Sequence, residues 1–289
     1  MKRRVLITGT TSLHGWPLYN ALTQQLGAAR VFGVCPPKTK PALFPDGNVT
    51  PCCVNDRDGL ERIFDQFEPT HVIHAAGICD LDVCEQWPSL AYQRNVEGTA
   101  NIVSLSRDCY LLQVSTDLVF SGNRPPLDGY TESCQPDPIS MIGKTFRQAE
   151  NIVQQLPKAA IIRKGLPMGP SFSGRKGPID YLAYRFSRGK PLTLFYDEMR
   201  SALSSQDLTH GLLKLLRLEV RGYFHLGGPK KVSLYDIGKY VIDSRAYDPV
   251  CLIRASRFAD TSGLPRIGDV ALNSQHAYDT MHYTPKPWP

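Results

Sequence analysis

The sequence contains no long apolar run. No stretch approaches the roughly 20 apolar residues that a helix needs to cross a bilayer, and the amino-terminal segment passes from the basic residues Lys2–Arg4 directly into a short apolar run. That segment has neither the apolar core nor the small-residue cleavage site of a signal peptide. We therefore expect no membrane association and place the protein in the cytoplasm.

Zinc-ligand spacing is absent as well. The eight cysteines include the neighbours Cys52 and Cys53 and a second pair, Cys79 and Cys84, whose members are five residues apart. Neither pair is matched by another pair at the separation that zinc sites use. We expect free thiols in a reducing compartment and no metal site.

A strong excess of one charge is also missing. The 33 basic and 27 acidic residues give a net charge of +6, and the basic residues are scattered, with no run beyond Lys2–Arg4. This distribution argues against nucleic-acid binding, while a mildly positive surface suits phosphorylated small molecules. With 42% hydrophobic and 21% charged residues, the chain of 289 residues can bury a full core.

The first half of the sequence alternates between two kinds of segment. Short β-rich apolar runs lie at residues 4–9, 30–34, 71–77, 109–116 and 158–164. Helical spacing of apolar residues occurs between them, at residues 16–27, 58–67 and 88–106, the last of which we predict as one long helix. This alternation predicts an α/β fold, a Rossmann-type doubly wound parallel sheet.

The pattern loosens after residue 163. Residues 165–178 are rich in glycine, proline and serine and are typical of a loop, and shorter elements follow. We predict a dinucleotide-binding domain over residues 1–163 and a smaller substrate-side lobe over residues 164–289, interleaved with the first. Such a lobe would cover the carboxyl edge of the sheet, where these folds bind ligands.

A glycine-containing loop, TGTTSLHG, lies between the first strand and the first helix. A strand, loop and helix in this order cradle a pyrophosphate, because backbone N–H groups point at it and the amino end of the helix is partly positive. The pattern is T-G-x-x-G-x-x-G with Ser12 at the middle glycine, and a plain tight turn is the alternative. The residues expected to contact a dinucleotide are Gly9, Thr11, Ser12, Leu13 and Gly15.

The end of the second strand bears on the choice of cofactor. An acidic residue there would bind the ribose 2′-hydroxyl of NAD, but this strand ends at Cys35, and Lys38 and Lys40 follow within reach of a 2′-phosphate. We therefore expect NADP(H) rather than NAD(H). Solvated lysines and no bound cofactor are the alternatives.

These features resemble the extended short-chain dehydrogenases, and most closely the dTDP-4-dehydrorhamnose reductase group of nucleotide-sugar ketoreductases. The resemblance covers nearly the whole chain, and the most specific motif is VSTDLVFSG at residues 114–122, which is similar to S-T-D-Y-V-F-x-G. LDVCE at residues 81–85 resembles the family's V-D-x-x-E segment. The resemblance implies further cofactor-binding residues, namely Asn55, Asp56, Ala75, Ala76, Gly77 and Asn95.

The catalytic positions of that family are altered here. Its Y-G-x-x-K segment aligns without a gap on Ile142 to Phe146, so the proton-donating tyrosine is Ile142 and the ribose-binding lysine is Phe146. Neither side chain can transfer a proton or donate a hydrogen bond. Lys144 lies about 200° around the helix from Phe146 and should not substitute.

Two functions remain open. The first is an atypical enzyme that acts on a nucleotide sugar or a related carbonyl compound by displaced chemistry. Its catalytic candidates are His14, which we expect to titrate near neutral pH, together with Cys79, Thr116, Asp117 and Tyr130. The structural alternatives are a solvent-facing His14, a small buried Cys79, a packing role for Tyr130 and a bond from Asp117 to its own turn.

The second function is a non-catalytic regulatory or scaffolding subunit that binds NADP(H) or a nucleotide sugar. The family offers a parallel in the β subunit of methionine adenosyltransferase, which resembles these reductases and serves as a regulator. A protein partner or a homodimer would fit this function. In the second half, Arg200 and Asp207 match the family's substrate-side spacing, and Arg200 would bind a phosphate; a surface ion pair between them is the alternative.

Overall fold

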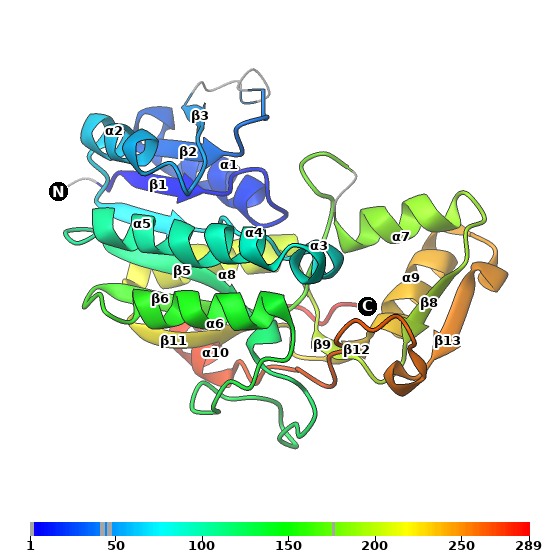
Figure 1. Ribbon diagram of the computed structural model, residues 1–289. Helices are drawn as coiled ribbons and strands as arrows, with labels where there is room; N and C mark the ends of the chain where they lie inside the picture. The colour runs from blue at the N-terminus through cyan, green and yellow to red at the C-terminus, as the bar shows by residue number, and fades with distance from the viewer. Residues whose placement is uncertain (1–2, 41–43, 45–47, 175–176) are drawn as a thin grey trace.

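Seven parallel strands form the centre of the molecule. The computed structural model describes residues 3–40, 44, 48–174 and 177–289, and the strands run in the order β11-β6-β5-β4-β1-β2-β3 (Figure 1). Their bounds are β1 Val5–Thr8, β2 Val31–Cys35, β3 Val49–Pro51, β4 His71–His74, β5 Tyr110–Thr116, β6 Ala159–Lys164 and β11 Gly222–Leu226. All six pairings are parallel, which confirms the predicted Rossmann-type sheet.

Helices cover both faces of this sheet (Figure 1). One face carries α2 Arg57–Phe67, α5 Gly98–Leu105 and α6 Met141–Val153, and the other carries α1 Gly15–Leu26, α8 Ser205–Leu218 and α10 Gln275–Met281. Leu111 packs on the first face and Leu112 on the second, because successive side chains of a strand point to opposite sides. Among the described helices, none has the length and apolar composition needed to traverse a bilayer.

The long helix predicted over residues 88–106 is continuous from residue 88 to residue 105 and contains one wide turn. The structure has α3 Leu81–Gln86, α4 Pro88–Tyr92, a π-helical turn Gln93–Glu97 and then α5. The wide turn carries Asn95, whose buried amide bonds to both backbone groups of Ile78. The single-helix prediction is therefore confirmed for residues 88–105. The π-helical turn was not predicted, because a tertiary contact of this kind leaves no trace in the apolar periodicity.

The second half of the chain contributes to both parts of the molecule. Strand β11 pairs with β6, and α8 packs against α1, so a division at residue 163 does not separate the sheet from the lobe. The lobe, at the right of Figure 1, has a core of its own around Leu182, Ile237 and Trp288. Its elements are β7 Pro167–Met168, α7 Pro178–Phe186, β8 Leu192–Phe195, β9 Met199–Ser201, β10 Leu203–Ser204, β12 Lys231–Ser233, α9 Leu234–Arg245 and β13 Leu252–Ala255.

A buried ion pair fixes α6 against the sheet. Both Arg163 Nε and Nη2 donate to Glu150, at 2.9 and 2.8 Å, and both residues are almost fully buried. Ser115 donates a third hydrogen bond to the same carboxylate at 2.7 Å. The Arg163 guanidinium also lies over the ring of Tyr223, 4.4 Å from its centroid. This network determines which residues of α6 reach the carboxyl edge of the sheet.

Removing the Glu150 charge should destabilise the fold strongly. We expect Glu150→Gln to lower the free energy of unfolding by about 3 kcal/mol, because it leaves a buried guanidinium without its counter-charge. Urea denaturation measures the change. Asp243→Asn is the matched control, since Asp243 pairs with Lys239 at 3.0 Å on the exposed face of α9, and it should cost no more than about 0.5 kcal/mol. Equal losses in the two variants would contradict this account.

Candidate functional site

The candidate site lies where the strand order reverses. From β1 the chain proceeds to β2 and β3 on one side of the sheet, and from β4 to β5 and β6 on the other. In such sheets the ligand crevice lies outside the carboxyl ends of the strands at this point. The segments that follow β1, β4, β5 and β6 therefore form the site.

The loop after β1 approaches the neighbouring chain closely. Gly9 has a φ of +74°, and a Cβ there would lie 2.6 Å from the Ala75 carbonyl oxygen, so this position requires glycine. Ser12 Oγ accepts a hydrogen bond from the Gly15 N–H at 2.9 Å. The serine thus uses one of the N–H groups at the start of α1.

The remaining donors of this loop are compatible with a pyrophosphate. The N–H groups of Leu13 and His14 donate no hydrogen bond within the described part of the chain. They lie at the amino end of α1, whose dipole favours a negative charge. The loop therefore fits a dinucleotide phosphate, although with one N–H fewer than a loop with three glycines would offer.

The residues predicted for the adenosine half lie around β2 and α2. Asp56 caps α2 by accepting from the Gly59 N–H at 2.9 Å, and Asn55 donates to the Gln93 carbonyl at 2.6 Å. Lys38 is exposed in the turn after β2, and no partner of its side chain is found among the described residues. Their contacts with a cofactor stay predictions.

The segment after β4 is held by hydrogen bonds to the last residue of β1. The Ala75 and Ala76 N–H groups donate to Thr8 Oγ1, and a Cβ on Gly77 would lie 3.0 Å from Phe146 Cζ. Asn95 is 2% exposed and donates to Thr145 Oγ1 at 2.9 Å in addition to its bonds with Ile78. Its amide supports this segment through these bonds, and a contact between Asn95 and a cofactor stays a prediction.

One turn of α6 presents hydrocarbon to the same segment. Ile142 and Phe146 are buried in an apolar cluster with Val119 and Phe120. Tyr130 belongs to the same cluster and stacks on Phe120, with 4.1 Å between ring centroids. Burial raises the pKa of the Tyr130 phenol, and its side chain is 5% exposed. Tyr130 therefore has the packing contacts of the structural alternative, and a catalytic role for it stays a prediction.

Asp117 and Arg200 form a second buried ion pair. Arg200 Nε donates to Asp117 Oδ2 at 2.7 Å and Nη2 to Oδ1 at 2.5 Å. Two expectations were therefore wrong: Asp117 does not bond only within its own turn, and the partner of Arg200 is not Asp207. Thr116 Oγ1 donates to Asp117 at 3.1 Å, so the predicted acid and the predicted phosphate ligand neutralise each other.

His14 and Cys79 lie on either side of the crevice, after β1 and β4. Burial and then the charge of Lys164 lower the pKa of His14 to about 3, against a hydrogen bond to the Ala75 backbone that raises it. His14 is therefore neutral near pH 7, and the expectation that it titrates there was wrong. Cys79 is reachable by solvent, but the protein packed around its sulfur raises the pKa of the thiol, while Lys164 lowers it.

The sequence predictions missed two residues at this edge. Lys164, the last residue of β6, is 7% exposed and lies opposite Thr116 in the sheet register. Glu198 is 8% exposed, and burial raises its pKa to about 7 against the charges of Arg200 and Arg266. A charged residue at the carboxyl end of a buried strand was the available signal for Lys164.

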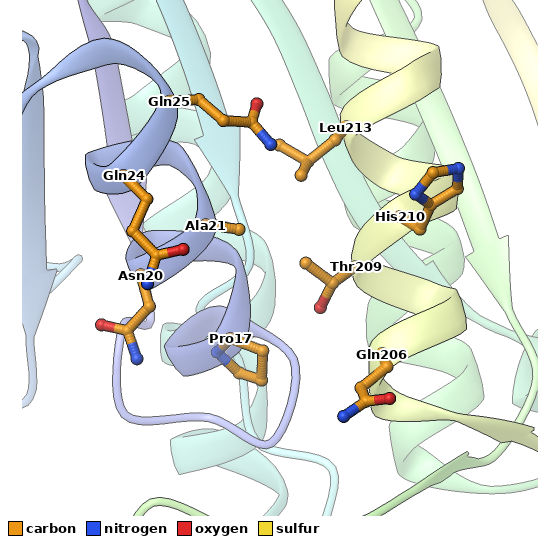
Figure 2. Close-up of a pocket in the computed structure, with 9 residues that line it drawn as sticks. All are labelled: Pro17, Asn20, Ala21, Gln24, Gln25, Gln206, Thr209, His210 and Leu213. Atoms are coloured by element: carbon orange, nitrogen blue, oxygen red, sulfur yellow. The ribbon is translucent and has the colours of Figure 1, made fainter.

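A groove of about 340 Å³ lies elsewhere, between α1 and α8 (Figure 2). Glutamine side chains from both helices reach into it, and Leu213 and Ala21 form its apolar part. It contains none of the residues predicted for the site. It is therefore a feature of the helical layer and separate from the carboxyl edge.

The sequence matches the model of one protein family over nearly its full length. The model describes the RmlD substrate binding domain and matches residues 3–289. The chain belongs to this family. The resemblance inferred from VSTDLVFSG and the neighbouring motifs is thereby confirmed, while the assignment of Ile142 and Phe146 to the catalytic positions stays a prediction.

Curated relatives of this RmlD-family chain have two kinds of name. Methionine adenosyltransferase 2 subunit beta from Danio rerio is 24% identical over 249 residues, which are 84% of this chain and 74% of the relative. A probable low-salt glycan biosynthesis reductase from Haloferax volcanii is 27% identical over 213 residues, 72% of this chain and 70% of the relative.

Solved structures share the fold at low identity. A dTDP-4-dehydrorhamnose reductase from Bacillus anthracis in complex with NADP has a TM-score of 0.83 and 21% identity, covering 100% of this chain and 96% of its own. The Bordetella bronchiseptica enzyme WbmG in complex with NAD and UDP has a TM-score of 0.80 and 22% identity, covering 99% and 90%. The chain thus has the fold of nucleotide-sugar reductases and epimerases.

Glu198 should make stability depend on pH. Its carboxyl group keeps a proton in the folded state up to about pH 7 but loses it near pH 4.5 when unfolded, so folded-state stability falls as the pH rises between these values. We expect Glu198→Gln to remove this component, worth up to about 3 kcal/mol. Thermal or urea unfolding of both proteins at pH 5 and pH 8 tests this. Between pH 5 and pH 8 the natural protein should lose up to about 3 kcal/mol of its free energy of unfolding that the variant keeps. The same pH dependence in both proteins would contradict the prediction.

Proposed function

We propose that this chain binds NADP(H) at the carboxyl edge of its sheet and acts as a non-catalytic regulatory or scaffolding subunit of another protein. The observation that carries the proposal is the hydrocarbon surface of Ile142 and Phe146 on α6. A ketoreductase needs a proton donor beside the carbonyl that it reduces. The buried Asp117–Arg200 pair adds support, because it occupies an acid and a phosphate ligand that a reductase would use.

The loss of rate that follows from a missing proton donor can be given an order of magnitude. Positioned acid–base catalysis contributes roughly 100- to 10,000-fold, or about 3–5 kcal/mol. A chain without that contribution could still bind a dinucleotide through the loop after β1, although Phe146 on α6 cannot make the ribose contact of the family's lysine. Bound NADP(H) could supply a hydride, but the residues described on α6 provide no proton to accompany it.

We infer the choice between NADP(H) and NAD(H) from the segment after β2. Related structures contain NADP in one case and NAD in the other, so the fold accommodates both. Here β2 ends at the buried thiol of Cys35 and not at an acid, and the exposed Lys38 follows. An ammonium group there favours a ribose 2′-phosphate, which supports NADP(H) over NAD(H).

The partner is inferred from the curated relatives. The name of the Danio rerio relative makes it a subunit of methionine adenosyltransferase 2, so the catalytic subunit of a methionine adenosyltransferase is the partner that we propose. All eight cysteines of this chain are free, which fits a cytoplasmic complex.

Displaced chemistry is the second candidate. The observation that favours it is the group of His14, Cys79 and Lys164 at the carboxyl edge, close enough to interact electrostatically. Such a group could act on a nucleotide sugar without the α6 residues. A neutral imidazole and a protonated thiol are, however, weak starting points for acid catalysis and nucleophilic attack respectively.

Lys38 should control cofactor selectivity. We expect Lys38→Ala to weaken NADPH binding by about tenfold, because a charge-assisted contact with the 2′-phosphate is lost, and to leave NADH binding unchanged. Nicotinamide fluorescence titration measures both affinities. Lys158→Ala is the control and should leave both affinities unchanged, since Lys158 is exposed directly before β6, at the amino edge of the sheet. Equal weakening of NADPH and NADH would show that Lys38 does not contact the 2′-phosphate.

The proposed function predicts assembly without turnover. The purified chain should form a complex of defined mass with the methionine adenosyltransferase catalytic subunit of its own source, measured by light scattering, and should change the KM of that enzyme. With NADPH and dTDP- or UDP-linked 4-keto sugars, it should oxidise no NADPH above the background rate. NADPH-dependent reduction of such a sugar by the unmodified chain would favour the second candidate.

A further inference from the structure

Lys164 is a cation at the carboxyl edge of the sheet with no partner in the described part of the chain. The residue is 7% exposed, and the described residues offer it neither an ion pair nor a hydrogen bond. Asp117, the predicted acid, is already bonded through both oxygens to Arg200. The Lys164 ammonium is not among the fully enclosed side-chain atoms that lack a partner, so it reaches the crevice and can act on a group that enters it.

The sheet geometry determines where the side chain points. Arg163, one residue earlier, reaches Glu150 of α6. Since successive side chains of a strand alternate, Lys164 points to the opposite face, toward the layer of α1 and α8. It shares that face with Thr116, its register partner at the end of β5.

The charge of Lys164 acts on two residues on either side of the crevice. Lys164 contributes to the lowered pKa of His14 in the loop after β1 and acts on the thiol of Cys79 after β4. Its ammonium group therefore lies within electrostatic reach of both sides of the point where the strand order reverses. A dinucleotide bound there places its adenosine half over β1 to β3 and its nicotinamide half over β4 to β6.

We propose that Lys164 makes the site selective for the reduced cofactor, because its ammonium group faces the nicotinamide half, where the oxidised ring carries a positive charge and the reduced ring carries none. This inference rests on the proposed binding of NADP(H). It assigns to the chain a preference for NADPH over NADP⁺, and it gives a regulatory subunit a means of responding to the redox state of the cofactor pool.

The expected preference follows from Coulomb repulsion. Two like unit charges about 7 Å apart at an effective dielectric constant of about 20 change a binding constant by roughly ten- to a hundredfold. The phosphates carry the same charge in both cofactor forms. A lysine that faced the phosphates would therefore strengthen both forms alike and create no preference.

The test compares dissociation constants for NADPH and NADP⁺, measured by isothermal titration calorimetry at one ionic strength. The natural protein should bind NADPH at least about tenfold more tightly. Lys164→Met should bring the two constants to within about threefold of each other, mainly by tightening NADP⁺ binding. Lys164→Arg keeps the charge and should keep the preference. Lys144→Met, which removes an exposed lysine from α6, should also keep it.

The outcomes separate this inference from the proposed function. If neither cofactor form binds the natural protein, the proposed function is overturned. If both forms bind it equally, the selectivity of Lys164 is overturned and cofactor binding stands. If Lys164→Met weakens both forms by the same factor, the lysine faces the phosphates and the inference is overturned. Should Lys164→Met fail to fold, judged by circular dichroism, the ratio in the natural protein and in Lys164→Arg still decides.

Discussion

The paired charges of Asp117 and Arg200 hold the sheet and the lobe together at the edge where ligands bind. Asp117 follows β5, Arg200 belongs to β9 of the lobe, and both side chains are buried. Removing two charges from water is expensive, and only a geometry with several short hydrogen bonds offsets it. The same contact that positions the lobe also withdraws a carboxylate and a guanidinium from chemistry. Architecture and function are therefore not independent at this edge.

Sequence reasoning recovered what depends on local order. The alternation of apolar runs and helical spacing predicts the parallel sheet, and the glycine pattern places Gly9 at a backbone position that no other residue could occupy. It could not recover contacts between distant segments. Strand β11 joins the sheet from residue 222 onward, and Arg200 finds Asp117 from 83 positions away. Spacing in the sequence suggested Asp207 as the partner of Arg200 because only near neighbours are visible there.

The apolar turn of α6 and the loop after β1 suit different functions. Phe146 contacts the segment beneath Gly77, and Ile142 is packed against the residues that follow β5. Restoring polar groups there would bury a charge or a hydroxyl among Val119 and Phe120, at a cost in stability. The loop, in contrast, keeps free N–H groups at the start of α1. An apolar turn on α6 beside a loop with free N–H groups is what the proposed binding of a nucleotide without catalysis requires.

Lys164 completes this argument, because a fold gains nothing from it alone. No carboxylate of the described chain bonds to it, and its ammonium is not among the fully enclosed atoms that lack a partner. A cation that is unpaired and reaches the crevice acts on the groups that enter the crevice. The turn of α6 at Ile142 and Phe146 offers only hydrocarbon, and the charges of Asp117 and Arg200 are paired with each other. We therefore infer that Lys164 gives the crevice a positive electrostatic potential.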